Sequence, residues 1–252
     1  MINQVNILGI ILIILCLGLI LAFAFIKKLS QITRLRDITA FKHLKQAIGL
    51  TVEDGKCLHI SLGQADLLDT TNASAFIGLS TLERLSQLAL ISDKPPIATS
   101  GSGALSILSQ DTLKYTYRKG NLSDQYQSER AYMTGVSPFS YAIGAVPIIK
   151  NEQVHTSLLI GNFGPEVALL TEAGDRQNAF TLAASDSLTG QAVLYAAAKE
   201  PLIGEELFAV PAYLNAGKFH QASLRAQDIL RWVLIIAILV GAILKFLGIS
   251  LI

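Results

Sequence analysis

Cysteine and histidine are scarce in this chain, and their scarcity limits the metal and redox chemistry open to it. The 252 residues include two cysteines and four histidines. Cys16 lies in a long apolar run and Cys57 in a short one, so we interpret both as packing residues rather than as a disulfide pair. No histidine is followed three or four residues later by a metal-ligating residue. The sequence therefore predicts no metal site and no cofactor, and His59 is predicted to be a hydrogen-bonded structural residue.

Clustered positive charge is missing from the middle of the chain. Charged residues make up 15% of the sequence, and the net charge is +1. From Gln46 to Leu224, 11 Lys and Arg stand against 17 Asp and Glu, which gives a net charge of −6. Because the neutralisation of phosphates needs clustered cations, we expect no nucleic-acid partner.

Sequence signatures of common enzymes are absent as well. No lysine directly follows Ser100-Gly101-Ser102-Gly103, so this run is not a P-loop, and its spacing is not that of the dinucleotide fingerprint. Neither Ser100 nor Ser185 lies in the Gly-x-Ser-x-Gly turn of a hydrolase. We therefore assign no catalytic residue.

Two long apolar runs, one near each end, are the strongest feature that is present. Val5–Ile26 has no charged residue, and Ile229–Ile249 has only Arg231 and Lys245. A bilayer core of about 30 Å needs roughly 20 helical residues, so we predict transmembrane helices over 5–26 and 229–249. A cleaved signal peptide is the alternative for the first run, but its length and the absence of positive residues before it favour an anchor.

Charges beside the first run predict how the chain is oriented. Lys27, Lys28, Arg34 and Arg36 follow this run, whereas Met1–Asn6 has no Lys or Arg. Positive residues stay on the cytoplasmic side, so we expect a two-pass protein with a cytoplasmic centre and both termini outside. The same four residues are predicted to face anionic lipid head groups.

The segment between the runs divides into a basic linker with a helix, 27–55, and an α/β domain, 56–222. Apolar residues recur at helical spacing over Ile32–Val52, and Gly55 stands where a helix C-cap glycine belongs. This helix either packs on the core of the domain or rests on lipid.

Four short apolar runs, each followed by a turn and a helical pattern, indicate the fold of the domain. The predicted strands are Cys57–Leu62, Pro96–Thr99, Thr156–Ile160 and Phe180–Ala184. The predicted helices are Ala73–Ile91, Ala104–Tyr117, one from Pro165 through Ala173 and one that runs to Lys199. Strands without strict alternation, in turn with helices, are typical of a three-layer α/β fold with an open, mainly parallel, Rossmann-like sheet.

Three further segments fit this alternation less well. Lys119–Glu129 is polar and is predicted to be a loop, and Leu202–Val210 a separate short helix. Phe139–Ile149 is either a helix broken near Pro147 or a segment at the bilayer surface.

Candidate ligand-binding residues follow the predicted strands, because ligands of open parallel sheets bind beyond the carboxyl ends of the strands. These candidates are Ser100, Gly101, Ser102, Gly103, Gly161, Asn162, Gly164, Ser185 and Asp186. Small residues leave backbone N–H groups open to a nucleotide or a small anion. The alternative is that they form ordinary turns and helix caps.

Small residues in the second apolar run predict close helix packing. Ala237, Gly241 and Gly248 fall near one face of the helix, in the small-xxx-small pattern of membrane helix pairs. The partner is either the first apolar helix or a neighbouring subunit.

Several runs resemble a family of bacterial membrane proteins with a domain of unknown function. They are SGSGALSILSQDTL (Ser100–Leu113), GNFGPEVALLTEA (Gly161–Ala173), FTLAASDS (Phe180–Ser187), PLIGEELFA (Pro201–Ala209) and LRAQDILRW (Leu224–Trp232). The resemblance implies two membrane helices around a cytoplasmic α/β domain, in the inner (cell) membrane of a bacterium. It implies no activity.

Together these observations predict a doubly membrane-anchored, non-catalytic scaffold or assembly subunit. Anchoring confines copies to one plane and raises their effective concentration, so we expect a homo-oligomer or a complex with other membrane-protein subunits. The alternative is a membrane-bound sensor or enzyme that binds a nucleotide or small anion at the loops beyond the strands.

Overall fold

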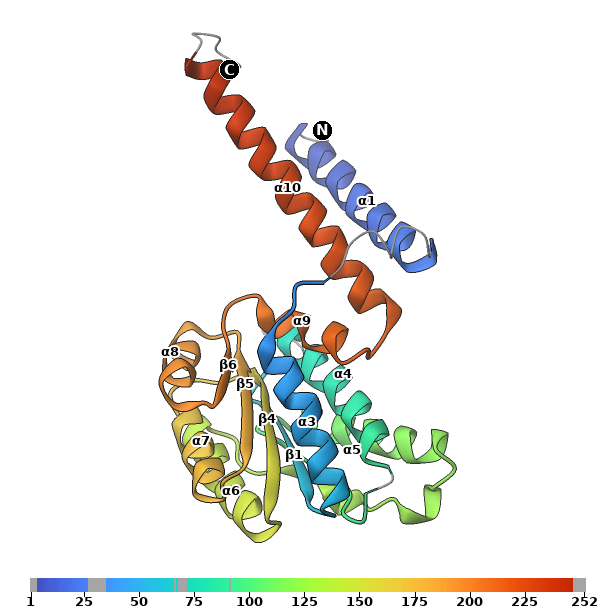
Figure 1. The fold of residues 1–252 in the computed structure, drawn as a ribbon, viewed down its shortest axis with the longest axis vertical. Coiled ribbons are helices and arrows are strands. Elements are labelled where there is room, and N and C mark those ends of the chain that lie inside the picture. Colours follow the sequence, from blue (N-terminus) through green and yellow to red (C-terminus); the bar gives the residue numbers. More distant parts are fainter. Residues whose placement is uncertain (1–3, 27–34, 66, 68–71, 91, 247–252) are drawn as a thin grey trace. The chain divides into compact units, whose positions relative to one another are not determined.

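The computed structural model describes residues 4–26, 35–65, 67, 72–90 and 92–246. The chain forms two compact units. One, the helical unit, combines Met1–Asp37 with Gly217–Ile252, and the other, the α/β unit, is Ile38–Ala216. Each is described by itself (Figure 1).

A six-stranded parallel sheet forms the centre of the α/β unit, as the sequence predicts. Its strands lie in the order β3-β2-β1-β4-β5-β6, and every pair of neighbours is parallel. The strands are β1 (Cys57–Gly63), β2 (Ile97–Ser100), β3 (Ala131–Met133), β4 (Val154–Asn162), β5 (Phe180–Ser185) and β6 (Glu200–Leu202). This is the strand order of the doubly wound dinucleotide-binding folds.

Helices cover both faces of this sheet (Figure 1). They are α3 (Thr39–Glu53), α4 (Asn72–Ala89), α5 (Gly103–Lys119), α6 (Pro138–Asn151), α7 (Val167–Arg176), α8 (Leu188–Ala197) and α9 (Glu206–Tyr213). Leu58, Ile60 and Leu62 share one apolar core with α3, α4, α5 and α9. Leu159 and Ala183 share a second core with α6, α7 and α8. The unit therefore has three layers, because alternate residues of a strand point to opposite faces.

Local chemistry explains where two of these helices begin or end. Gly55, with a φ of +61°, follows the end of α3 and confirms the predicted C-cap glycine. A capping box starts α6, since the Ser137 side chain accepts a hydrogen bond from the Ser140 backbone and the Ser140 side chain accepts one from the Ser137 backbone. Pro147 lies inside α6 without ending it.

The structure differs from the prediction at four segments. Two short edge strands, β3 and β6, were not predicted, and β6 contains Pro201, which edge strands tolerate. The helix predicted over Ile32–Val52 begins only at Thr39. The segment Phe139–Ile149 belongs to one continuous helix, α6, which buries Tyr141 and three further residues against the sheet.

The helical unit consists of α1 (Gln4–Phe25) and α10 (Lys218–Phe246). The end of α1 packs against the start of α10, where Phe23, Ala222 and Ala226 are buried and the rings of Phe25 and Phe219 lie 6.2 Å apart. The two helices therefore run antiparallel. Among the described residues, α10 is the one helix long and apolar enough to cross a membrane, whereas the apolar part of α1, Gly9–Phe25, is shorter.

The predicted small-residue face of α10 does not contact α1 in the part of the chain that the structure describes. Ala237 is exposed, and a Cβ atom placed on Gly241 would meet no atom within 4 Å. Gly248 lies outside the described residues, as do Lys27, Lys28 and Arg34. The fourth basic residue, Arg36, is exposed.

Candidate functional site

The carboxyl edge of the sheet brings the predicted ligand-binding residues together. Ser100 ends β2 and Gly103 begins α5, Gly161 and Asn162 end β4 with Gly164 in the loop after it, and Ser185 ends β5 just before Asp186. The chain leaves β1 toward β2 and β3, and α6 then carries it back to β4 on the other side of β1. The strand order thus reverses between β1 and β4, which is where doubly wound folds bind ligands.

Three backbone donors at this edge have partners within the protein, whereas no side chain caps the start of α5 at Ser102. The Gly101 N–H donates to the Gly63 carbonyl at 2.9 Å, and the Gln64 N–H donates to the Asn162 carbonyl at 2.9 Å. The Gly164 N–H donates to Glu166 Oε1 at 2.7 Å. These three donors are therefore not available to a phosphate.

Ser185 is also fully occupied. Its buried hydroxyl accepts hydrogen bonds from the N–H groups of Phe163 (3.0 Å) and Ser187 (3.1 Å) and donates to the Phe163 carbonyl at 2.9 Å. Ser185 therefore joins the ends of β4 and β5. On the neighbouring loop, Asn162 donates to Asp186 Oδ1 at 2.6 Å, and both residues are half-buried.

Two glycines at this edge are explained by close backbone packing. Gly63 has a φ of +67°, and a Cβ atom there would collide with the Asn162 carbonyl. A Cβ atom on Gly161 would collide with the Leu62 carbonyl. Glycine thus lets the ends of β1 and β4 approach each other.

Glu166 is the residue of this edge that sequence reasoning missed. It lies just before α7, and its side chain is 2% exposed. One carboxylate oxygen accepts from the Gly164 N–H, but the other, Oε2, is buried with no hydrogen-bond partner among the residues the structure describes. A buried carboxylate oxygen without a donor is costly, so Glu166 is the acceptor at this edge whose missing partner needs an explanation. The Gly-Pro-Glu run at the end of β4 was the only signal in the sequence.

A buried polar network underlies the β1 end of this edge. His59 contacts the Ser157 hydroxyl at 3.0 Å and the Thr99 hydroxyl at 2.9 Å through its two ring nitrogens. The Tyr141 hydroxyl bonds to Ser61 and lies 3.4 Å from Thr99. Burial lowers the pKa of His59 to about 4 and raises the pKa of Tyr141, so both side chains are neutral near pH 7. The network ties β1, β2 and β4 to α6, which agrees with the structural role predicted for His59.

A cavity of about 870 Å³ lies elsewhere, at the amino edge of the sheet, where α4 and α5 end. Two smaller cavities, of about 410 and 420 Å³, adjoin α3. None of these three is lined by a predicted ligand-binding residue. Within the described ranges, no group of three His, Cys, Asp or Glu side chains is placed to hold a metal ion.

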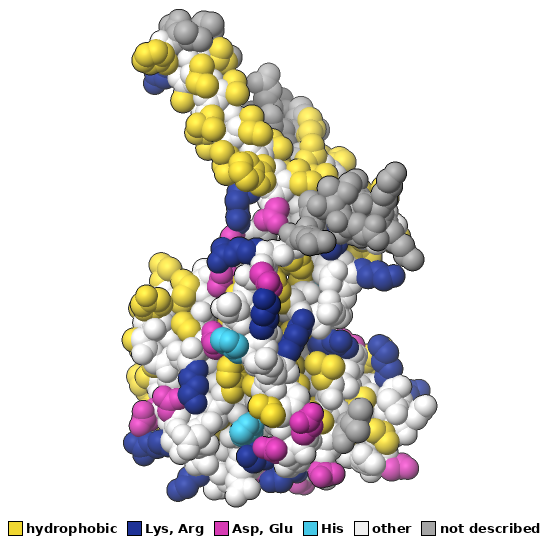
Figure 2. Space-filling view, viewed as in Figure 1, with side chains coloured by type: hydrophobic (Ala, Val, Ile, Leu, Met, Phe, Trp, Pro, Cys, Tyr) yellow, Lys and Arg dark blue, Asp and Glu magenta, His cyan; other side chains and the backbone are white. Residues whose placement is uncertain are grey.

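The outer surface of α6, α7 and α8 is unusually apolar. We define the apolar face as Phe139 and Ile143 on α6, Leu169 on α7, and Leu188 and Tyr195 on α8. Ile143 is 61% exposed, Leu188 81% and Tyr195 76%. Figure 2 shows hydrophobic side chains gathered over α8. The basic residues of these helices stand in the last turns of α6 and α7, and on α7 the exposed Glu172, three residues after Leu169, pairs with Arg176 at 2.8 Å.

Comparison with known proteins identifies a family but no individual relative. No curated protein matches the chain, and no solved structure matches it. A family model described as "Domain of unknown function (DUF6754)" matches residues 1–252. Since the match spans the whole chain, this protein belongs to the DUF6754 family.

Proposed function

We propose that this protein is a doubly membrane-anchored assembly subunit whose α/β units associate with one another through the apolar face. The observation that carries the proposal is the exposure of five large apolar side chains on one side of the sheet. Contiguous exposed apolar patches of several hundred Å² mark interaction surfaces on soluble domains. The role is structural, and no catalytic residue is assigned to it.

Anchoring at both ends is supported by features of each unit taken separately. Within the helical unit, α10 has the length and composition of a membrane span, and α1 runs antiparallel to it. Within the α/β unit, the rings of Phe41 and Tyr213 stack 4.4 Å apart, so the chain enters and leaves this unit at neighbouring points. We therefore propose two spans in a bacterial inner membrane, with the α/β unit cytoplasmic and both termini outside.

The size of the apolar face suits an interface between two proteins. Its five side chains expose roughly 600 Å² of surface in all, and a standard interface buries about 800 Å² on each partner. The smaller exposed residues Pro147, Ala168 and Ala192 on the same helices extend it. Phe139 and Ile143 are four residues apart, so they lie on the same side of α6.

A second copy of this chain is the partner that the charge distribution favours. Helices that rest on lipid carry several Lys and Arg beside their apolar residues. In α6, α7 and α8 the basic residues are Lys150 and Arg176, at the ends of α6 and α7, and Arg176 is paired with Glu172. An uncharged apolar surface is complementary to itself, as a two-fold symmetric interface requires. Two anchored copies meet in one plane, which raises their effective concentration.

The test measures the mass of the full-length protein in detergent micelles and in nanodiscs by light scattering. The wild type is expected to form dimers or larger assemblies. In Ile143→Glu/Leu188→Glu a symmetric interface would bury four carboxylates without partners, which should weaken association by about 100-fold or more.

Ile107→Glu is the matched control, because Ile107 is 63% exposed on α5, in the other helix layer. It is expected to leave the mass unchanged. A wild type that stays monomeric at high protein concentration would contradict the proposal, and so would equal effects of the control and the double variant.

A second candidate function is favoured by Glu166 alone. Its unpartnered oxygen belongs to the loop after β4, and the half-buried Asp186 belongs to the loop after β5, at the same edge of the sheet. These acceptors suit a ligand with hydroxyl or amine donors, such as a nucleoside, better than a free phosphate. Adenosine is expected to raise the melting temperature of the wild type but not of Glu166→Gln. The absence of any shift at millimolar adenosine would end this second proposal without affecting the first.

A further inference from the structure

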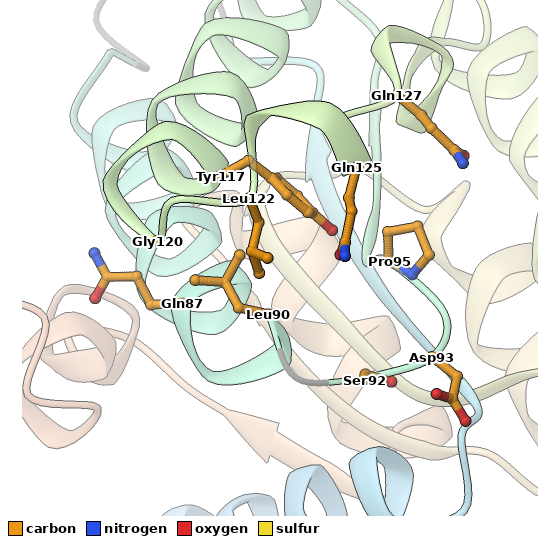
Figure 3. Close-up of a pocket in the computed structure, with 10 residues that line it drawn as sticks. All are labelled: Gln87, Leu90, Ser92, Asp93, Pro95, Tyr117, Gly120, Leu122, Gln125 and Gln127. Atoms are coloured by element: carbon orange, nitrogen blue, oxygen red, sulfur yellow. The ribbon is translucent and has the colours of Figure 1, made fainter.

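The cavity at the amino edge of the sheet has the size of a small-molecule site. Its volume is about 870 Å³, within the roughly 300–1,000 Å³ typical of ligand pockets. The end of α4, the segment before β2, the end of α5 and the loop after it form its walls (Figure 3). It lies at the other edge of the sheet from Glu166 and outside the apolar face, so it has no part in either function proposed above.

One side of the cavity is apolar and includes an aromatic ring. In Figure 3, Tyr117 and Leu122 project from the end of α5 and the following loop toward Leu90 and Pro95. The packing here is close, since a Cβ atom on Gly120 would lie 2.7 Å from a methyl group of Leu90. Such a surface can contact the C–H face of a ring-shaped ligand.

The polar side of the cavity offers amide, hydroxyl and carboxylate groups. Gln125 and Asp93 are exposed, and their side chains make no hydrogen bond or ion pair with other described residues. The Ser92 hydroxyl is itself buried, with no partner in the described part of the chain. The amide of Gln127 also lines the cavity, and its oxygen accepts from Arg130 at 3.0 Å. Amides and carboxylates placed together pair well with neighbouring hydroxyl groups.

Charge at the cavity opposes an anionic ligand. Asp93 is the one charged residue among those that line it, and no Lys, Arg or His does. The carboxyl ends of α4 and α5 lie at its wall, and helix C-termini carry partial negative charge. Arg118 and Lys119 stand in the last turn of α5 without lining the cavity.

We propose that this cavity binds a polyhydroxylated small molecule without negative charge, of the saccharide class. The ring of the sugar lies against Leu90, Leu122 and the Tyr117 ring. Its hydroxyl groups bond to the exposed side chains of Gln125 and Asp93. A positively charged amino sugar binds more tightly than an acidic sugar because of Asp93.

The experiment uses the full-length protein in a zwitterionic detergent, because glycoside detergents would compete for the site. Saturation-transfer NMR measures binding of three probes: glucosamine, N-acetylglucosamine and glucuronate. Glucosamine and N-acetylglucosamine are expected to bind with millimolar affinity, and glucuronate at least tenfold more weakly. Gln125→Ala removes one hydrogen-bonding side chain, so it should weaken the binding of glucosamine and of N-acetylglucosamine by roughly fivefold.

Two further variants make the result specific. Asp93→Asn should remove the preference for glucosamine over glucuronate while N-acetylglucosamine still binds. Gln177→Ala, at the end of α7 in the other helix layer, should change nothing. No transfer signal from any probe would overturn the proposal, and so would tightest binding of glucuronate or equal binding by wild type and Gln125→Ala.

Discussion

The buried His59 should make the α/β unit sensitive to mild acid. Its side chain is fully buried between β1, β2 and β4, and both ring nitrogens have hydroxyl partners. Burial lowers its pKa from 6.5 to about 4. The unfolded chain therefore takes up a proton near pH 6.5, whereas the folded chain does not until near pH 4.

The sign and size of the effect follow from this difference in pKa. The stability due to neutral His59 is fully present above pH 6.5 and is lost as the pH falls toward 4. The full difference in pKa corresponds to about 3 kcal/mol in the free energy of unfolding, and about 2 kcal/mol of it is lost between pH 7 and pH 5. The equilibrium constant for opening should rise about 20-fold over that interval.

Labelling of Cys57 with a maleimide measures this opening. Cys57 is buried in β1, and burial raises the pKa of its thiol to about 12, so the folded state does not react. Labelling is followed by peptide mass to separate Cys57 from Cys16. The labelling rate of Cys57 at each pH is divided by the rate for the unfolded chain at the same pH, so that the pH dependence of the maleimide reaction itself cancels.

The comparison of variants decides the result. His59→Gln should lose most of the pH dependence, whatever its absolute stability. His155→Gln alters a partly exposed histidine at the start of β4, whose pKa is also lowered by burial, and should lose only a smaller part of the dependence than His59→Gln. If the normalised labelling rate of Cys57 rises by the same factor from pH 7 to pH 5 in His59→Gln and in the wild type, the argument from His59 is refuted.

Two further predictions concern the carboxyl edge of the sheet. Glu166→Gln keeps an oxygen acceptor for the Gly164 N–H but puts a buried NH2 group in the place of the unpartnered Oε2, so it is expected to destabilise the α/β unit by about 1 kcal/mol, measured by urea unfolding; unchanged stability would show that this NH2 group finds an acceptor. Ser185→Ala leaves the Phe163 and Ser187 N–H groups without their acceptor and should cost about 2–3 kcal/mol in the same assay. The matched change Ser187→Ala, at a half-buried helix start, should cost under about 1 kcal/mol, and equal losses would contradict the role given to Ser185.

The layered fold was predictable because its central strands are long apolar runs between turns. Cys57–Gly63 and Val154–Asn162 are buried along almost their whole length, and such runs are typical of a parallel sheet covered on both faces. The edge strands β3 and β6 have three residues each. A run that short carries no period, so only pairing with a neighbouring strand identifies it.

The candidate site was predictable in place but not in chemistry. Parallel strands end at one edge, so Gly101, Gly161 and Ser185 had to meet there. Whether their N–H and O–H groups are free depends on partners distant in sequence, such as Gly63 for Gly101. The burial of Glu166 and the cavity between α4 and α5 likewise arise from tertiary packing, which local sequence does not encode.

Self-association through the apolar face is tested most directly by a disulfide between copies in the membrane. Tyr195 is 76% exposed on α8, and Tyr195→Cys in a Cys16→Ala background leaves buried Cys57 as the other thiol. Mild oxidation of native membranes should yield a covalent dimer of the full-length protein, and adding Ile143→Glu/Leu188→Glu should abolish it. Monomer alone after oxidation, or a dimer that survives the two glutamates, would contradict the account.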